Sequence, residues 1–323
     1  MTGLVLFAGG GGSCQGLRQA GLDLGLGVEW DRAAVQVAQA AGLEHTVQAD
    51  VRDASLYREG MADVLWSSFP CQAWSTAGKR KGAQDERNMW PATVDVVDHV
   101  QPRWVIAENV RGLPFHRGKA KCGKGKHPQP MLCPRCYLDH VIVPQLGKRF
   151  AWVDWRVLDS ADYGTPQHRR RLFVVAGPRP IVWPSPTHSD PAALTLGTQP
   201  WVSMGAALRL QGPWLAAPAP TVTAQEVKGT RAGPGGDFNG GPDRASDALA
   251  MGTGYAVRNG AEHLPSGRRR LTVAECRVLM GWPPCYDEVL EGVTKTAAYR
   301  ILGNGVDPEM ARLLGVAVAK ADR

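Results

Sequence analysis

Short apolar runs that end at glycines or polar residues recur along the first half of the chain. The first, LVLFA, meets four glycines, and the segment after them has the spacing of a helix that Ser13 caps and Gly21 ends. Apolar runs and helical stretches then alternate as far as a strand over 103–107. This alternation is typical of an α/β protein with a doubly wound, mostly parallel sheet.

Polar side chains follow four of the expected strands directly. Glu29, Asp50, Cys71 and Glu108 each stand at or just after the end of one. Ligands of open parallel sheets bind outside the carboxyl ends of the strands. We therefore expect these four residues to converge on one rim, which is the predicted site.

The rest of the chain divides into an insertion, a smaller unit and closing helices. Residues 119–140 are rich in Lys, Gly, Pro, Cys and His, and residues 178 to about 267 are rich in Gly, Pro and Trp. We expect a large domain of residues 1–178 plus 290–323, which carries the insertion, and a smaller domain of residues 179–289. Three further elements are expected: a strand over 171–177 and helices from Thr272 and from Pro308.

Composition indicates a folded intracellular protein with reduced thiols. The chain has 323 residues, of which 44% are hydrophobic and 21% charged, as in ordinary globular proteins. Seven unevenly spaced cysteines argue against a disulfide framework, and the first apolar run is too short for a membrane span or a signal peptide. A net charge of +7 favours a polyanionic partner without requiring one.

The glycine turn at 9–12 predicts a nucleotide-like ligand. It exposes backbone amides at a helix start, and Glu29, about twenty residues further on, can accept both hydroxyls of a ribose. Cys14 and Gln15 occupy the place of the third glycine of a dinucleotide motif, which disfavours NAD. Taken singly, Glu29 and Asp50 would be solvated loop acids.

Seven motifs then occur in a fixed order: LFAGGGGS, VEWD, FPCQAWSTAG, ENVRGL, DYGTPQHRRRLFVV, RRLTVAECRVLMGWP and ILGNGVDPEMARLLG. Together they resemble the DNA cytosine-5 methyltransferase family from residue 3 to about 315, outside residues 115–150 and 180–267. The resemblance implies a Rossmann-like sheet that binds S-adenosylmethionine and a smaller target-recognition domain. It also implies methylation of a cytosine that is flipped out of double-stranded DNA.

The resemblance assigns the chemistry to four residues. Cys71 is expected to add to carbon 6 of cytosine, and Glu108 to bind ring nitrogen 3 and the exocyclic amine, for which its pKa must be raised. The site must favour the Cys71 thiolate, because a free thiol has a pKa of about 8.5. Arg169 and Arg171, two apart on an extended segment, would place both guanidiniums on one face for phosphate and base contacts. The alternative for the arginines is a pair of surface charges.

The resemblance also implies contacts to cofactor and DNA. Trp30 is placed to pack on the adenine, and Asn304 borders cofactor and catalytic loop. Gln72 would face the gap left by the flipped base, and Ser75 a phosphate. Ser67 and Ser68 stand where the family often has two glycines. The expected cofactor-binding residues are Phe7, Ala8, Gly9, Gly10, Gly11, Gly12, Glu29, Trp30, Asp50, Pro70 and Asn304.

The insertion holds a candidate zinc site. Cys133 and Cys136 have the C-x-x-C spacing of structural zinc, and Cys122 with one histidine, His127 or His140, would complete four ligands. We take Cys122, His127, Cys133 and Cys136 as the candidate ligands. A single C-x-x-C is only moderately specific, and a loop of reduced, unligated cysteines is the alternative.

Three other functions compete with DNA methylation. Transfer-RNA cytosine-5 methylation belongs to a branch of the same family, although residues 180–267 suit a duplex better. A catalytically inactive DNA-binding relative has no reason to keep Cys71 with Glu108, and a nicotinamide oxidoreductase leaves PCQ, ENV and QHRRR unexplained. We expect a DNA (cytosine-5-)-methyltransferase that is monomeric, cytoplasmic and nucleoid-associated, without membrane contact. A restriction endonuclease would be its functional, not physical, partner in restriction-modification.

Overall fold

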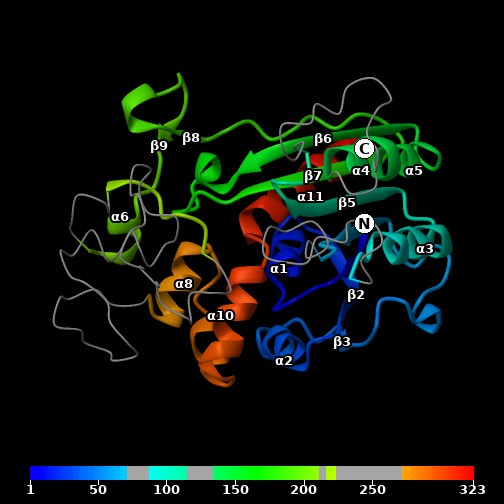
Figure 1. Cartoon of the computed structure of the whole chain (residues 1–323), viewed down its shortest axis with the longest axis horizontal. Helices are drawn as coiled ribbons and strands as arrows, with labels where there is room; N and C mark the ends of the chain where they lie inside the picture. Colours follow the sequence, from blue (N-terminus) through cyan, green and yellow to red (C-terminus); the bar gives the residue numbers. More distant parts are fainter. Residues whose placement is uncertain (71–86, 115–133, 211–215, 223–270) are drawn as a thin grey trace.

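The computed structural model describes residues 1–70, 87–114, 134–210, 216–222 and 271–323, and its centre is a seven-stranded sheet (Figure 1). In sheet order the strands are β3 (Thr46–Gln48), β2 (Asp23–Glu29), β1 (Thr2–Leu6), β4 (Val64–Ser67), β5 (Trp104–Val110), β7 (Arg170–Gly177) and β6 (Trp152–Asp159). The first five are parallel, and β7 runs antiparallel between β5 and β6. The predicted doubly wound, mostly parallel sheet is confirmed. A two-stranded ladder joins β8 (His188–Ser189) to β9 (Gln199–Pro200).

Helix ends follow local capping chemistry. Thr272 and Glu275 form a reciprocal capping box at the start of α8, and Asp307 caps α11. The first helix begins two residues earlier than expected, because Gly11 turns the chain at φ +95° and so becomes the cap in place of Ser13. The helices are α1 (Gly12–Gln19), α2 (Arg32–Ala40), α3 (Trp90–Val100), α4 (Pro134–Tyr137), α5 (Val143–Gly147), α6 (Met204–Leu208), α8 (Val273–Leu279), α9 (Tyr286–Glu291), α10 (Lys295–Asn304) and α11 (Pro308–Asp322). Within the described ranges, no helix is both long and apolar enough to cross a membrane.

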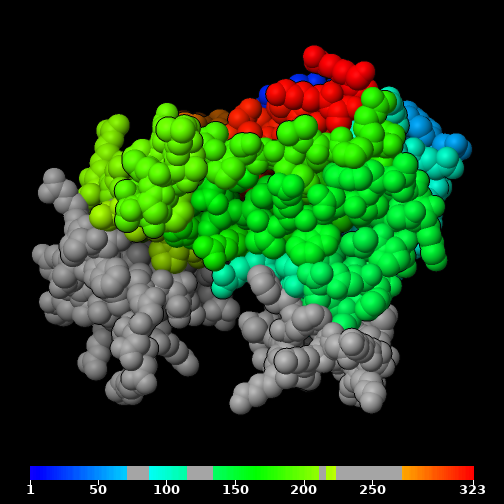
Figure 2. Space-filling model, turned by 90° about the horizontal axis from the view of Figure 1, so that it is seen from above, coloured from blue at the N-terminus to red at the C-terminus, as the bar shows by residue number. Residues whose placement is uncertain are grey.

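Helices cover both faces of the sheet. Because side chains alternate along a strand, Leu65 and Val105 face a core with α3 and α5, whereas Trp66 and Ile106 face a second core with α1 and α11. Figure 1 shows α3 and α5 together at one side of the sheet and α11 beside α1. In Figure 2, turned to show the face above, β6 and the chain after β7 (green) cover the centre, with α11 (red) along one border. The strand ends between these layers stay available for a site.

A third core joins the C-terminal helices to the sheet domain. Cys276 of α8 and Leu302 of α10 pack in one cluster with Ala34 of α2. This cluster runs without a break across residue 290, where the domain boundary was expected. The division into a large and a small domain stays a prediction.

Candidate active site

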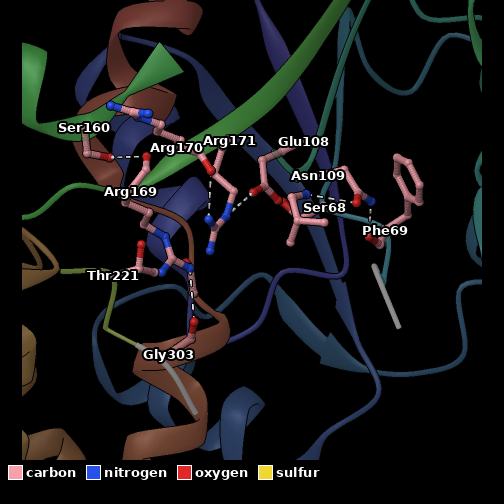
Figure 3. Close-up of polar contacts among 12 residues, drawn as sticks. Ser68, Phe69, Glu108, Asn109, Ser160, Arg169, Arg170, Arg171, Thr221 and Gly303 are labelled. Carbon is pink, nitrogen blue, oxygen red and sulfur yellow. Dashed lines mark hydrogen bonds and ion pairs between the residues drawn. The ribbon is translucent and has the colours of Figure 1, made fainter. Parts of the chain in front are cut away.

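Glu108 and Arg171 meet on one face of the sheet. Arg171 lies opposite Val110 in the antiparallel pairing of β7 with β5, so it is diagonal to Glu108 and faces the same side. The Arg171 Nε lies 3.2 Å from Oε1 of Glu108 (Figure 3). These two motif residues therefore meet at the carboxyl end of β5, a contact that the sequence analysis did not predict.

Burial sets the protonation of Glu108. Its side chain is 13% exposed, and desolvation raises the pKa of the carboxyl above its usual range. The charges of Arg171 and Arg169 and a hydrogen bond from Ser68 oppose that rise without cancelling it. A carboxyl in this state holds its proton to higher pH than a solvated one, which suits an acid that shares a proton with a ring nitrogen.

Ser68 supplies a partner that the sequence showed only as a departure from the family pattern. Its Oγ lies 2.8 Å from Nε1 of Trp66, which donates to it, and its hydroxyl bonds Glu108 in turn. The carboxyl is therefore oriented from two sides, by Ser68 and by Arg171 (Figure 3). In the sequence, Ser68 in place of a glycine gave no indication that it would bind Glu108.

Asn109 holds the chain that leads into the cysteine motif. Its side chain is 2% exposed and donates to the carbonyl of Phe69 over 2.9 Å. The Phe69 ring packs against Trp90 at 5.2 Å between ring centroids. Pro70 follows as a partly buried residue, so the approach to residue 71 is fixed at its start.

Three predicted residues of the cysteine motif lie outside the described residues. They are Cys71, Gln72 and Ser75, and their roles stay predictions. Cys14, by contrast, is described and fully buried, and burial raises the pKa of its thiol to about 12. A thiol in that environment stays protonated at neutral pH, which makes Cys14 a packing residue.

The expectation for Arg169 needs correction. Arg169 and Arg171 do point to the same side of the chain, away from Arg170, as alternation requires (Figure 3). Arg169, however, is only 2% exposed. Its guanidinium donates to the carbonyls of Val222 at 3.1 Å, Gly303 at 3.1 Å and Gly305 at 2.6 Å. A guanidinium enclosed by main-chain carbonyls is committed to the fold, so we no longer assign it a contact to phosphate or base.

Glu29 organises the glycine turn. Its Oε2 accepts the amide hydrogen of Gly9 and its Oε1 that of Asp31, both over 2.8 Å. A carboxylate has about four acceptor positions, so capacity for two ligand hydroxyls remains. Trp30 lies next to Glu29 and is 73% exposed, which leaves its indole face accessible.

Only one of the four glycines faces open space. A Cβ at Gly9 would meet nothing within 4 Å, although its φ of +57° favours glycine. A Cβ would come within 2.5 Å of Ile301 at Gly10, within 2.1 Å of Leu43 at Gly11, and within 2.2 Å of the Val306 carbonyl at Gly12. These three glycines permit close packing, whereas the sequence suggested that all four served a ligand.

The remaining cofactor candidates lie around this turn. Phe7 adopts a positive φ of 57° directly after β1, and the Ala8 amide donates to Val28 across the strand end. Asp50 follows β3, and a hydrogen bond from Arg52 lowers the pKa of its carboxyl. Asn304 is exposed at the end of α10, two residues before the Val306 carbonyl that approaches Gly12.

The opposite face of β7 holds polar groups to which the sequence analysis assigned no role. Oδ2 of Asp159 lies 2.9 Å from Nε of Arg170 and 3.1 Å from Nδ1 of His168. Beside them opens a cavity of about 360 Å³. Its lining residues are Arg111, Val157, Asp159, Asp162, Arg170 and Trp201.

The candidate zinc site falls almost entirely outside the described residues. Cys122, His127 and Cys133 all lie there, and only Cys136 is described, buried in α4. In the described part of the chain, no three His, Cys, Asp or Glu side chains are grouped to hold a metal ion. Zinc binding is therefore without support from the described residues.

Comparison with known proteins places the chain in a family. The family described as C-5 cytosine-specific DNA methylase matches residues 1–190. The Type II methyltransferase M.NaeI of Lentzea aerocolonigenes is 30% identical over 98% of this chain and 74% of that protein. M.AplI of Arthrospira platensis is 26% identical over 98% and 84%. The solved structure of the Entamoeba histolytica methyltransferase EhMeth shares the fold, with a TM-score of 0.65 at 14% identity over 100% of this chain and 99% of that one. The chain belongs to the C-5 cytosine-specific DNA methylase family.

Proposed function

We propose that this protein is a DNA (cytosine-5-)-methyltransferase that modifies a flipped-out cytosine within a specific sequence of double-stranded DNA. The observation that carries the proposal is the buried Glu108, held by Arg171 and Ser68 and with a raised pKa, at the strand end beside the entry to the PCQ motif. Family membership and the Type II DNA methyltransferases among its relatives support the same reading.

The glycine-turn rim fits the S-adenosylmethionine that this family uses. Open space beside Gly9 admits a ligand, Glu29 retains acceptor capacity for ribose hydroxyls, and the exposed Trp30 offers a face for an adenine. Asp50 and Asn304 lie on the chain around this rim and would complete the site. When bound, S-adenosylmethionine supplies an electrophilic methyl group.

The chain's own residues would prepare the cytosine to accept that methyl group. The Cys71 thiolate forms a bond to carbon 6 while ring nitrogen 3 takes a proton from Glu108, which turns carbon 5 into an enamine carbon. Arg171 and Ser68 hold the Glu108 carboxyl toward the ring. After carbon 5 has gained its methyl group, water removes the carbon-5 proton, the double bond between carbons 5 and 6 re-forms as Cys71 leaves as a thiolate, and ring nitrogen 3 returns its proton to Glu108.

DNA binding requires surfaces beyond the catalytic pair. Flipping the base costs a few kcal/mol, which pocket contacts and filling of the gap by Gln72 would offset, with Ser75 at a phosphate. Sequence specificity would lie within residues 180–267. We propose a monomer acting at the nucleoid, with a restriction endonuclease as a functional partner of the kind that Type II enzymes have.

Covalent trapping tests the proposal directly. Duplex DNA in which 5-fluorocytosine replaces cytosine should form a denaturation-resistant adduct with the parent protein in the presence of S-adenosylmethionine, because fluorine at carbon 5 blocks proton loss. Cys71→Ser should form no adduct. Cys14→Ser, which alters the buried thiol of α1, is the matched control and should be trapped like the parent.

Nucleoside mass spectrometry identifies the substrate. The parent protein is incubated with S-adenosylmethionine and either unmethylated DNA or transfer RNA. We expect 5-methylcytosine in DNA alone, and sequencing of the modified sites then gives the target. Methylation of transfer RNA alone would replace the proposal with the RNA branch, and no product from folded protein on varied DNA would favour an inactive DNA-binding relative.

A further inference from the structure

Residues 165–169, here called the junction segment, connect η5 (Ser160–Tyr163) to β7 and contact two distant parts of the chain. One is the entry stem, residues 219–222, which leads into residues 223–270. The other is α8, which begins just after residue 270. The junction segment thus contacts the described chain on both sides of residues 223–270, most of which belong to the region proposed to read DNA sequence.

The entry stem is bound to the junction segment along its main chain. The His168 amide donates to the Ala219 carbonyl over 2.7 Å, and the Ala219 amide donates back to Pro166 over 2.9 Å. The Thr221 hydroxyl adds a bond of 2.6 Å to the His168 carbonyl. These bonds form a short parallel pairing between the junction segment and the entry stem.

Gln167 joins both sides through a single side chain. It is fully buried, and its Oε1 accepts the amide hydrogen of Val222 over 3.1 Å. Its Nε2 donates to the Leu279 carbonyl over 2.8 Å and lies 3.1 Å from Sδ of Met280. A carboxamide that uses donor and acceptor together fixes the distance between its partners, here the entry stem and the end of α8.

The same segment continues without a break into the catalytic pair. Two residues after Gln167, Arg169 binds the Val222 carbonyl and the turn at Gly303. Two residues further, Arg171 reaches Glu108. Because this stretch runs directly into a paired strand of the sheet, continuous main chain connects the residues that contact both stems to Arg171.

We propose that Gln167 is a positioning residue that couples engagement of target DNA, through the entry stem and the end of α8, to the placement of Arg171 beside Glu108. The inference rests on the proposed function and deepens it: recognition at one place would set proton transfer at the other. Gln167 touches neither base nor cofactor in this scheme and acts only through the strand that carries Arg171.

The test compares substitutions at two glutamines whose side chains both form internal hydrogen bonds. Gln167→Met keeps the length of the side chain and removes both hydrogen bonds. Gln145→Met is the matched control, because Gln145 also accepts an internal hydrogen bond, 2.7 Å from Nε1 of Trp90, but lies in α5 away from the stems. A second variant, Gln167→Glu, retains an acceptor toward Val222, but it replaces the donor toward Leu279 and adds an ionisable carboxyl to a buried site.

Three quantities are measured for each protein: melting temperature, S-adenosylmethionine affinity by calorimetry, and methylation of the target and of one-base variants over a range of pH. We expect Gln167→Met to lose about tenfold in the ratio of kcat/KM for target over variant sites, within the usual size of site-to-site coupling. The basic limb of its kcat profile should also move, while cofactor affinity stays within about twofold of the parent. Gln167→Glu should show the same changes in weaker form.

Equal loss of melting temperature in Gln167→Met and Gln145→Met, with discrimination and pH profile unchanged in both, would overturn the coupling and leave a structural role. Failure of the proposed function itself is read from the parent, which would then methylate no DNA. Because the target is identified with the parent before any variant is assayed, the two failures are distinct.

Discussion

The guanidinium of Arg171 on β7 and the carboxyl of Glu108 on β5 are 3.2 Å apart, Nε to Oε1, across two antiparallel strands. The pairing is diagonal, so each side chain depends on the register of both strands. Glu108 is at the same time desolvated enough for its pKa to stand above the usual range. The two residues form one acid whose strength is set by burial and moderated by a neighbouring cation.

Glu108→Gln should abolish most of the methyl transfer and leave cofactor binding intact. The amide keeps the shape of the side chain but has no proton to give ring nitrogen 3, and general acid catalysis contributes about a hundredfold to ten-thousandfold in rate. Single-turnover kinetics with tritiated S-adenosylmethionine measure the loss. Asp98→Asn, which changes an exposed carboxylate paired with Arg149, is the control and should retain the parent rate. Equal activity in both variants would remove Glu108 from the mechanism.

Arg171→Met should extend activity to higher pH while lowering its maximum. In the parent, the Arg171 charge opposes the rise of the Glu108 pKa. Its removal raises that pKa further, and since the protonated acid is the proposed active form, the basic limb of the kcat profile moves up. A pH series of single-turnover rates checks the direction. A limb that stays in place or moves down would show that another group controls it.

The two glycines at the ends of the turn should respond differently to alanine. Gly12→Ala would place a Cβ about 2.2 Å from the Val306 carbonyl, so we expect a destabilisation of about 1–3 kcal/mol, as for overpacking. Gly9→Ala has room and suffers only from its φ of +57°, at a cost of about 1 kcal/mol. Its main effect should be on S-adenosylmethionine affinity. Urea unfolding measures the effect on stability, and calorimetry measures the effect on S-adenosylmethionine affinity. A larger loss of stability in Gly9→Ala and a larger loss of affinity in Gly12→Ala would contradict the assigned roles of the two glycines.

Asp307→Asn should become more stable relative to the parent as pH rises. Asp307 is 2% exposed, burial raises the pKa of its carboxyl, and its Oδ2 accepts from the Thr165 hydroxyl over 2.6 Å. At pH 4 the unfolded carboxyl is about half protonated, with a reference pKa of about 3.9. Above it, ionisation favours the unfolded chain until the raised native pKa is passed. Asparagine carries no such penalty and still caps a helix. Urea unfolding at pH 4 and pH 7 measures the difference in unfolding free energy between Asp307→Asn and the parent. If the stability of the variant relative to the parent falls as pH rises, the predicted direction is wrong.

The sequence was informative where local rules decide the outcome. Strand and helix alternation predicted the sheet, and the position of Glu108 directly after an apolar run predicted its place at a strand end. Arg169 was misjudged because alternation gives the direction of a side chain but not the depth of what covers it, and the carbonyls that cover it come from residues 222 and 303–305. The roles of Ser68 and Gln167 were missed for the same reason, since each depends on partners far along the chain.

The contacts made by the glycine turn also determine when, during folding, the proposed cofactor site can form. The Tyr286 hydroxyl donates to the Gly10 carbonyl over 2.9 Å, and the Val306 carbonyl fills the space beside Gly12. Both contacts join residues far apart in the chain, and the first joins residues separated by 276 positions. On the ribosome, β1 and α1 must therefore wait for α9 to α11 to emerge before the turn is locked. Since non-local contacts of this length slow folding, the rim should be among the last parts of the molecule to become ordered.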